Sequence, residues 1–375
     1  MVYLDYSATT KINEDVLDSY ITVSKEFFGN PNSLHKLGVK SKELLNEATK
    51  QIANLLKINE SEIIYTSSAT QANNLAVIGS CLSNENLGNH IIISRLEHPS
   101  MYNIVNFLEK KGYEIDYVNN TDEGFIDFDH LKSLIKKTTV LVTICAINSE
   151  VGCRQPLKTI RQVIKKENPK TIFHSDITQG IGKININLSD VDLASCSAHK
   201  FYGPLGIGLL YKSNDIKINP SVIGSDETQI ISQTPATPLI VAMSKALRIS
   251  LHELAKKEEI VEKLNEKICN HLLKYENIKI NKVKSSIPHI LNISLPGIRP
   301  ETFIHALEEE EIFVSSNTAC SKGKPSPTVF LLTQSKELAL SSIRISLSYL
   351  TTNDEINNFL FHFDKIYNQL TSLEE

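Results

Sequence analysis

A lysine and an aspartate near the ends of two strand-like runs are the residues of this chain best suited to chemistry. Lys200 lies in residues 197–204, shortly after an apolar run at 191–194, and Asp176 ends a run at 171–176. A lysine amine forms a Schiff base with an aldehyde, and a carboxylate keeps a pyridine nitrogen protonated so that the ring withdraws electrons. The pair predicts an enzyme that uses pyridoxal phosphate.

A polar segment lies between a strand-like run at 63–66 and a helical pattern at 69–80. Its serine and threonine residues are typical of a helix start, and Gln71 suits a capping box. A helix start also presents amide donors and a positive dipole end, which suit a phosphate, and Ala69 and Thr70 carry the natural donors. An ordinary helix cap without a ligand explains the same residues.

Four more polar residues lie close to these segments. His98 follows a strand-like run in a turn, where it would either stack on a flat ring or remain a solvated loop histidine. Gln179 comes three residues after Asp176 and is placed to reach a ring hydroxyl. Ser197 and His199 precede Lys200 in the same loop and are candidates for binding phosphate oxygens.

Composition narrows the class of protein. The 375 residues include 39 basic and 43 acidic side chains, a balance that gives no case for a nucleic-acid or membrane-surface partner. The six cysteines are scattered without a C-x-x-C pair, which is typical of reduced thiols. Residues 1–10 do not resemble a signal peptide, and no apolar run reaches the length of a membrane span. We therefore expect a cytoplasmic protein.

Helical and strand patterns alternate through most of the chain, which favours an α/β fold with a mostly parallel sheet covered by helices. Near residue 240 the pattern changes to one long helical stretch, 240–275. We therefore expect a large domain at 15–255 and a smaller α+β domain formed by 1–14 and 256–375. Further strands are expected at 90–94, 140–146, 290–295 and 343–347, and further helices at 101–110, 157–166 and 354–370.

Nine short motifs occur in a fixed order along nearly the whole chain. They lie at residues 4–10, 28–35, 68–71, 97–98, 148–152, 176–179, 197–200, 316–321 and 341–347. Together they resemble the pyridoxal-phosphate-dependent cysteine desulfurases of the NifS/IscS type, within the class V aminotransferases of fold type I. The resemblance implies a large domain with a central, mostly parallel seven-stranded sheet flanked by helices, and a homodimer without a metal site.

The resemblance also implies a role for each matching residue. Lys200 is the Schiff-base lysine, His98 stacks on the cofactor ring and takes part in catalysis, and Asp176 pairs with the ring nitrogen. Gln179 contacts the ring hydroxyl, and Arg344 holds the substrate carboxylate, as a planar guanidinium is suited to do. The remaining implied contacts are Asn148 for the substrate, Ser149 for the cofactor, and Ala69, Thr70, Ser197, His199 and, from the neighbouring subunit, Thr234 for the phosphate.

Cys320 is the residue that distinguishes a desulfurase from other enzymes with this cofactor. It lies in the polar stretch 315–327, whose glycine and prolines are typical of a loop. By the resemblance, its thiolate takes sulfur from L-cysteine, leaves L-alanine, and passes the persulfide to an acceptor protein. Acceptors in iron–sulfur cluster assembly and in the thiolation of tRNA or other molecules both fit. A free surface thiol without a role is the alternative from the residues alone.

Several positions depart from the family pattern, among them Gln71, which stands where a glutamate is usual. Ser149 stands where a second asparagine is usual, and Ile231 and Gln233 replace an arginine and a glycine. Two alternatives therefore stay open beside the desulfurase. One is another fold-type-I enzyme with the same cofactor, such as a selenocysteine lyase or an aminotransferase. The other is a desulfurase-like protein of low activity with a regulatory or binding role.

Overall fold

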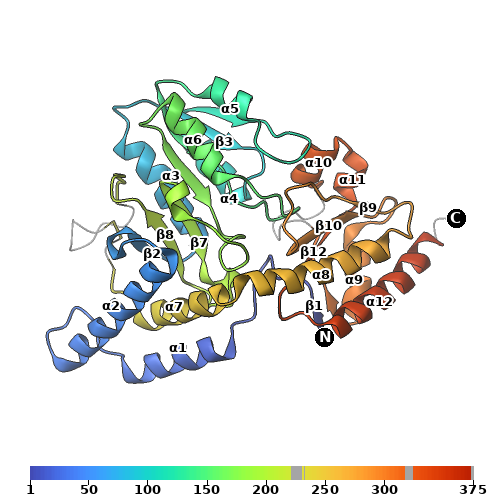
Figure 1. Ribbon diagram of the computed structural model, residues 1–375, viewed down its shortest axis with the longest axis horizontal. Coiled ribbons are helices and arrows are strands. Elements are labelled where there is room, and N and C mark those ends of the chain that lie inside the picture. Colours follow the sequence, from blue (N-terminus) through green and yellow to red (C-terminus); the bar gives the residue numbers. More distant parts are fainter. Residues whose placement is uncertain (221–229, 232, 317–323, 373–375) are drawn as a thin grey trace.

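The computed structural model describes residues 1–220, 230–231, 233–316 and 324–372. A seven-stranded sheet forms the centre of its larger part (Figure 1). All neighbouring strands are parallel except β8, which runs antiparallel to both β2 and β7. The expected α/β class with a mostly parallel seven-stranded sheet is confirmed. In spatial order the strands are β2 (Ile63–Thr66), β8 (Gly208–Lys212), β7 (Leu193–Ser197), β6 (Ile172–Asp176), β5 (Thr139–Thr143), β3 (His90–Ser94) and β4 (Glu114–Val118).

Four inner strands, β3, β5, β6 and β7, are buried along their whole length. Continuous apolar runs are expected for parallel strands whose two faces are both covered. One face packs against α3 (Ala69–Ser83) and α4 (Pro99–Glu109). The other packs against helices that include α1 (Glu14–Glu26), α2 (Lys36–Leu56), α5 (Phe128–Leu134), α6 (Leu157–Glu167) and α7 (Thr237–Leu251). No helix in the described ranges combines the length and apolar character needed to cross a membrane.

A second hydrophobic core joins the start of the chain to its last third. An antiparallel sheet contains β9 (Lys279–Ile280), β10 (Ile290–Ser294) and β12 (Ser342–Ser346), and β1 (Val2–Tyr3) pairs in parallel with β11 (Ile312–Phe313). The helices α8 (Leu254–Leu272), α9 (Pro300–Glu309) and α12 (Asn353–Thr371) pack on these strands, and α10 (Pro327–Thr333) and α11 (Lys336–Leu340) lie beside them (Figure 1). The division of the chain into 15–255 against 1–14 and 256–375 stays a prediction.

The long helical stretch expected at 240–275 is two helices, so that prediction was wrong in its continuity. The first, α7, ends at Leu251, and α8 begins at Leu254. Between them His252 is extended and Glu253 takes the left-handed conformation at φ 50°. Neither residue is a glycine or a proline, so the usual signal of a helix end is missing from the sequence. The break lies where the chain passes from one core to the other (Figure 1).

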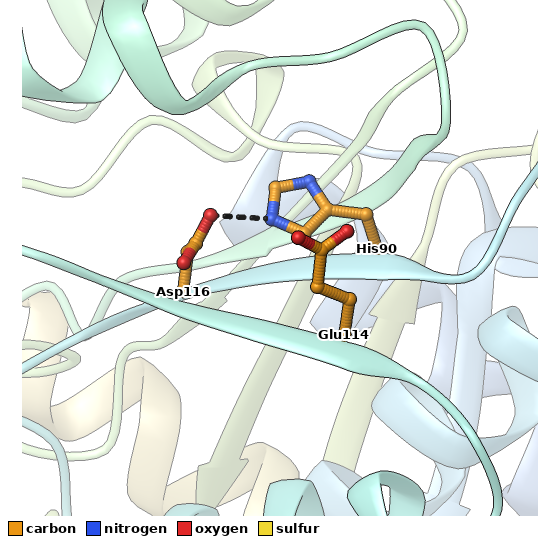
Figure 2. Close-up of side chains that lie close together, drawn as sticks. All are labelled: His90, Glu114 and Asp116. Atoms are coloured by element: carbon orange, nitrogen blue, oxygen red, sulfur yellow. Dashed lines mark hydrogen bonds and ion pairs between the residues drawn. The ribbon is translucent and has the colours of Figure 1, made fainter.

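A polar cluster joins the first residues of β3 and β4 (Figure 2). The Nε2 atom of His90 lies 3.0 Å from Asp116 Oδ2, and its Nδ1 atom lies 2.7 Å from Thr139 Oγ1. The Nζ atom of Lys136 lies 2.5 Å from Glu114 and 3.4 Å from Asp116, so a cation of the chain itself compensates both carboxylates. This cluster links the amino-terminal ends of β3, β4 and β5. Asp176, the last residue of β6, lies at the opposite, carboxyl-terminal end of the strands.

Candidate active site

A cavity of about 280 Å³ lies where β6 and β7 end and where α3 and α4 begin. Ligands in open α/β sheets bind at this carboxyl edge of the strands. Residues of both cores line the cavity, since Ser7, Ala8 and Arg344 belong to the segments packed around the smaller sheet. The lining includes ten residues that the sequence had singled out, namely Ala69, Thr70, His98, Ser149, Asp176, Gln179, Ser197, His199, Lys200 and Arg344.

Lys200 follows β7 directly, at the end of the 3-10 turn Ala198–Lys200. Its Nζ atom donates hydrogen bonds to the carbonyl oxygens of Ser7 at 2.5 Å and Ala8 at 2.7 Å. Burial, followed by the charge of Arg344, lowers the pKa of Lys200 to about 8. The unprotonated amine that a nucleophile or base requires is therefore accessible near neutral pH.

Asp176 is the last residue of β6 and is held by two donors. The backbone N–H of Thr178 donates to Oδ1 at 2.9 Å, and the side-chain amide of Asn73 donates to Oδ2 at 2.8 Å. Both bonds fix the orientation of the carboxylate. Asn73 was missed by the sequence reading, although it lies four residues after Ala69 and so shares a face of α3 with the predicted phosphate site.

The first turn of α3 faces the cavity with its free amides. The hydroxyl of Ser68 accepts from the N–H of Gln71 at 3.2 Å and so caps the helix. Ala69 and Thr70 line the cavity, and the first turn contains no acidic residue that would compete with an anion. The Gln71 side chain accepts from the N–H of Ser67 at 2.6 Å instead of from the cap residue, so the reciprocal capping box suggested for Gln71 does not form.

Two histidines stand in the cavity wall in neutral form. His98 caps α4, and its Nδ1 atom accepts from the N–H of Ser100 at 3.2 Å, which leaves the ring proton on Nε2. Burial lowers the pKa of His98, although Asp176 partly opposes this shift. Burial, followed by the charge of Lys200, lowers the pKa of His199 to about 4. Both rings therefore add polar contacts without adding charge.

Arg344 on β12 is the largest polar side chain in the wall, with only 2% of its surface exposed. One terminal nitrogen donates to Asp5 Oδ1 at 2.8 Å, and the other donates to the backbone oxygen of Ser149 at 3.0 Å. Within the described chain, its buried Nε atom has no hydrogen-bond partner. A guanidinium fixed in this way, with a donor to spare, is suited to bind a carboxylate.

Asn148 does not line the cavity, in contrast to most of the predicted residues. Its Oδ1 atom accepts from the N–H groups of Glu150 at 2.8 Å and Val151 at 2.9 Å, and its Nδ2 atom donates to the oxygen of Leu96 at 3.0 Å. The side chain therefore shapes the turn that carries Ser149. A direct contact between Asn148 and a substrate stays a prediction.

Two further predicted residues lie away from the cavity or beyond the described chain. Thr234 is exposed and is not part of the cavity lining, so its expected contact with a neighbouring subunit stays a prediction. Cys320 lies outside the described residues. On its N-terminal side, Ser315 exchanges backbone hydrogen bonds of 3.1 and 2.6 Å with Arg344, and on its C-terminal side the hydroxyl of Ser326 donates to the carboxylate of Glu150.

The fold and the cavity at the strand ends define the general class of protein. Residues 2–359 match the family Aminotransferase class-V. A solved structure described as a NifS-like protein has the same fold, with a TM-score of 0.92, 32% sequence identity and 99% coverage of both chains.

Curated relatives narrow the class further. A NifS/IcsS homologue of Lactobacillus delbrueckii subsp. bulgaricus is 36% identical and covers 100% of this chain and 99% of its own length. The cysteine desulfurase IscS of Dictyoglomus turgidum is 34% identical over 99% of this chain and 96% of that protein. The chain therefore belongs to the aminotransferase class-V family and, within it, to the cysteine desulfurases of the NifS/IscS type. The resemblance inferred from the motifs is confirmed.

Proposed function

We propose that this chain is a cysteine desulfurase that uses pyridoxal phosphate. It would remove sulfur from L-cysteine, release L-alanine, and hold the sulfur as a persulfide on Cys320 for an acceptor protein. The observation that carries the proposal is the meeting of Lys200, Asp176 and Arg344 in one cavity. Full-length relatives named as cysteine desulfurases support the choice of reaction within the family.

The residues of the cavity fit pyridoxal phosphate. A lysine amine with a lowered pKa and a fixed carboxylate stand at strand ends, and the start of α3 offers amides to a phosphate. In the described residues the buried Ser7 Oγ has no hydrogen-bond partner, as expected of a polar atom that awaits a ligand. When bound, this cofactor supplies an aldehyde that joins to an amine and a ring that withdraws electrons.

Each protein residue of the cavity would then have a separate role in the reaction. Arg344 binds the substrate carboxylate and sets the direction of the α-hydrogen. Lys200, once its amine is free, removes that proton and returns it, because its lowered pKa matches a base that acts near neutral pH. Asp176 keeps the ring nitrogen protonated through its charge. His98 and Gln179 lie in the same wall and would contact the ring face and the ring hydroxyl.

Sulfur transfer would fall to Cys320. Its thiolate attacks the substrate sulfur, so that an S–S bond forms while the bond between sulfur and the substrate β-carbon breaks. The electron pair of the broken bond stays with carbon, which takes up a proton and becomes the methyl group of alanine. Support comes from the described residues on either side of 317–323, since Ser315 bonds to Arg344 and Ser326 to Glu150, one residue after Ser149 in the cavity wall.

Replacement of Lys200 by alanine tests the cofactor assignment. The variant should lose the visible absorption of lysine-bound cofactor, because no other lysine lines the cavity in the described residues. Absorption spectra of purified protein with added pyridoxal phosphate would show this. Lys212→Ala is the matched control, since Lys212 Nζ bonds to the oxygens of Ser213 and Ile216 outside the cavity. Unchanged spectra in Lys200→Ala would refute the assignment.

Replacement of Cys320 by serine separates sulfur transfer from cofactor binding. The variant should keep the cofactor spectrum of the parent protein but form neither alanine nor sulfide from L-cysteine in the presence of a reductant. Cys269→Ser is the control, because Cys269 lies on α8 and is only partly buried. Full alanine formation by Cys320→Ser would exclude the proposed thiol. Keto-acid formation in its place would favour an aminotransferase.

A homodimer with Thr234 at the neighbouring site and a cytoplasmic location stay predictions from the sequence. The sequence names neither the acceptor nor whether selenocysteine is also a substrate. Transfer of labelled sulfur from Cys320 to candidate acceptor proteins would identify the pathway. Sedimentation of the purified chain would measure its oligomeric state.

A further inference from the structure

A second buried lysine lies just behind the cavity wall. Lys183 is buried but does not line the cavity, and its Nζ atom donates to Gln179 Oε1 at 2.7 Å. Two nearby cations, Lys200 and Arg344, add to burial in lowering the pKa of Lys183. A buried lysine without a compensating carboxylate is costly, and its presence beside a site calls for a specific reason.

The backbone holds Lys183 in this place. It follows Gln179 by four residues in an irregular turn, and its N–H donates to the oxygen of Gly180 at 3.0 Å. Gly182 has φ 75°, and a Cβ atom there would lie 2.9 Å from the Cβ of Ser250 and 3.0 Å from that of Phe201. Because only glycine fits this conformation and this approach, the turn fixes the position of Lys183 relative to the cavity.

The Gln179 side chain has its orientation fixed by two different partners. Its Oε1 atom accepts from Lys183, while its Nε2 atom donates to the carbonyl oxygen of Ser7 at 2.9 Å. A carbonyl can only accept, and an ammonium can only donate, so both partners select the same orientation of the amide. One N–H of Nε2 is left without a protein partner in the described part of the chain, on a residue that lines the cavity.

We infer that Lys183 is a positioning residue, which locks the Gln179 amide so that an N–H and not the oxygen faces the bound cofactor. This inference rests on the proposed function, in which Gln179 meets the ring hydroxyl of pyridoxal phosphate. A donor at that place draws electron density from the ring oxygen. The oxygen then becomes a weaker acceptor for the proton on the Lys200 nitrogen, so that this proton leaves at a lower pH.

The charged and titratable groups around Lys183 come from both cores. Lys200 and Arg344 act on it from the cavity side, and His289 lies beside it at the smaller core. Burial, followed by these two cations, lowers the pKa of Lys183 to about 7, while burial and Lys183 together lower that of His289 to about 3. The neutral amine keeps N–H donors, and the carbonyl oxygen of Ser7 accepts from Gln179 at any pH, so the amide keeps its orientation across neutral pH.

A double-mutant cycle on the cofactor-loaded protein tests the inference. The measured quantity is the pH midpoint of the cofactor absorption change in the parent protein, Lys183→Met, Gln179→Leu and the double variant. Lys183→Met should raise the midpoint by about one pH unit, a tenfold change in proton affinity. The double variant should match Gln179→Leu alone, because Lys183 acts only through the amide. Lys212→Met, which removes a lysine whose pKa is also lowered by burial but which lies outside the cavity, should leave the midpoint unchanged.

The outcomes distinguish this inference from the proposed function. Additive shifts in the double variant would mean that Lys183 acts through its charge alone and would refute the inference. An unchanged midpoint in Lys183→Met would refute it as well. A parent protein that binds no pyridoxal phosphate would refute the proposed function, and the inference with it. Thermal melts of all five proteins confirm that each is folded, and methionine retains the length and apolar stem of Lys183.

Discussion

At the residue scale, the carboxylate of Asp176 depends on a neighbour that also lines the cavity. Asn73 donates to Oδ2 at 2.8 Å, and its own Oδ1 atom is buried without a partner in the described residues. A hydrogen bond to a charged group contributes about 1.5–3 kcal/mol. The carboxylate of Asp176 therefore owes its orientation in part to Asn73.

Replacing Asn73 by alanine should weaken cofactor binding about tenfold, since 1.4 kcal/mol corresponds to a factor of ten. Titration of cofactor-free protein with pyridoxal phosphate would measure this dissociation constant. Asn74→Ala provides the control, because the adjacent Asn74 bonds to the backbone oxygen of Thr70 and does not line the cavity. Equal dissociation constants for the two variants would show that Asn73 does not support Asp176.

Sequence reasoning found the residues that act from strand ends and missed those that act through tertiary contacts. Lys200 and Asp176 were predicted because Asp176 ends one strand-like run and Lys200 comes shortly after another. Asp5 and Lys183 were missed because their partners, Arg344 and Gln179, become neighbours only in the folded chain or in an irregular turn. Asn148 carried a local signal that was overlooked, because an asparagine side chain that accepts two N–H groups further along is typical of a turn.

At the scale of elements, α10 is capped by a serine, Ser326, whose hydroxyl has two partners. The hydroxyl of Ser326 accepts from the N–H of Val329 at 3.0 Å and donates to the buried carboxylate of Glu150. Burial raises the pKa of Glu150, and the bond from Ser326 opposes this shift. The start of α10 is thereby tied to the turn that carries Ser149 in the cavity wall.

Ser326→Ala should lower the free energy of unfolding by about 2–3 kcal/mol, because it removes a helix cap and leaves a buried carboxylate without its donor. Ser335→Ala is the matched control, since Ser335 caps α11 at 3.3 Å without contacting a carboxylate. Its cost should be about 1 kcal/mol. Urea unfolding of both variants would measure the difference. Equal losses would mean that the bond to Glu150 contributes nothing to stability.

Regular elements were easier to predict from the sequence than their interruptions. The strands at 63–66 and 90–94 were predicted to the residue, because apolar runs between polar turns define them. The strand expected at 140–146 ends at Thr143, although residues 144–146 remain buried. Ile144 and Ala146 still donate backbone hydrogen bonds to His174 and Asp176 of β6, at 3.1 and 2.9 Å, so the point where the regular strand stops leaves no mark on the sequence pattern. The same holds for the break at Glu253, which depends on how α8 meets the second core.

At the scale of the whole molecule, buried histidines link stability to pH. Burial is the main cause that lowers the pKa of His174 to about 4 and that of His289 to about 3. In the unfolded chain both histidines have a pKa of about 6.5. Below that pH the unfolded chain therefore binds more protons than the folded one. The stability that the neutral rings provide is therefore complete above pH 6.5 and is lost as the pH falls toward 4 and below.

His289→Leu should flatten this dependence, because a neutral side chain replaces one that resists protonation. We expect the difference in unfolding free energy between pH 7 and pH 4.5 to shrink by about 2 kcal/mol, given roughly 1.4 kcal/mol for each pKa unit. Urea unfolding at several pH values would show the change in slope. The exposed His252→Gln serves as control and should keep the parent slope. If the free energy of unfolding fell equally steeply with pH in the parent and in His289→Leu, the argument would be contradicted.

The first residues of the chain impose an order on its biosynthesis. Asp5 needs Arg344, which follows it by 339 positions, and the Ser7 and Ala8 carbonyls accept from Lys200. At roughly 5–20 residues per second, a ribosome delivers Arg344 about 20 to 70 s after Asp5. The amino-terminal strand must therefore wait, unpaired, until nearly the entire polypeptide has emerged. Nascent chains halted before this arginine should consequently retain little vitamin B6, even though Lys200, the proposed attachment residue, was made long before.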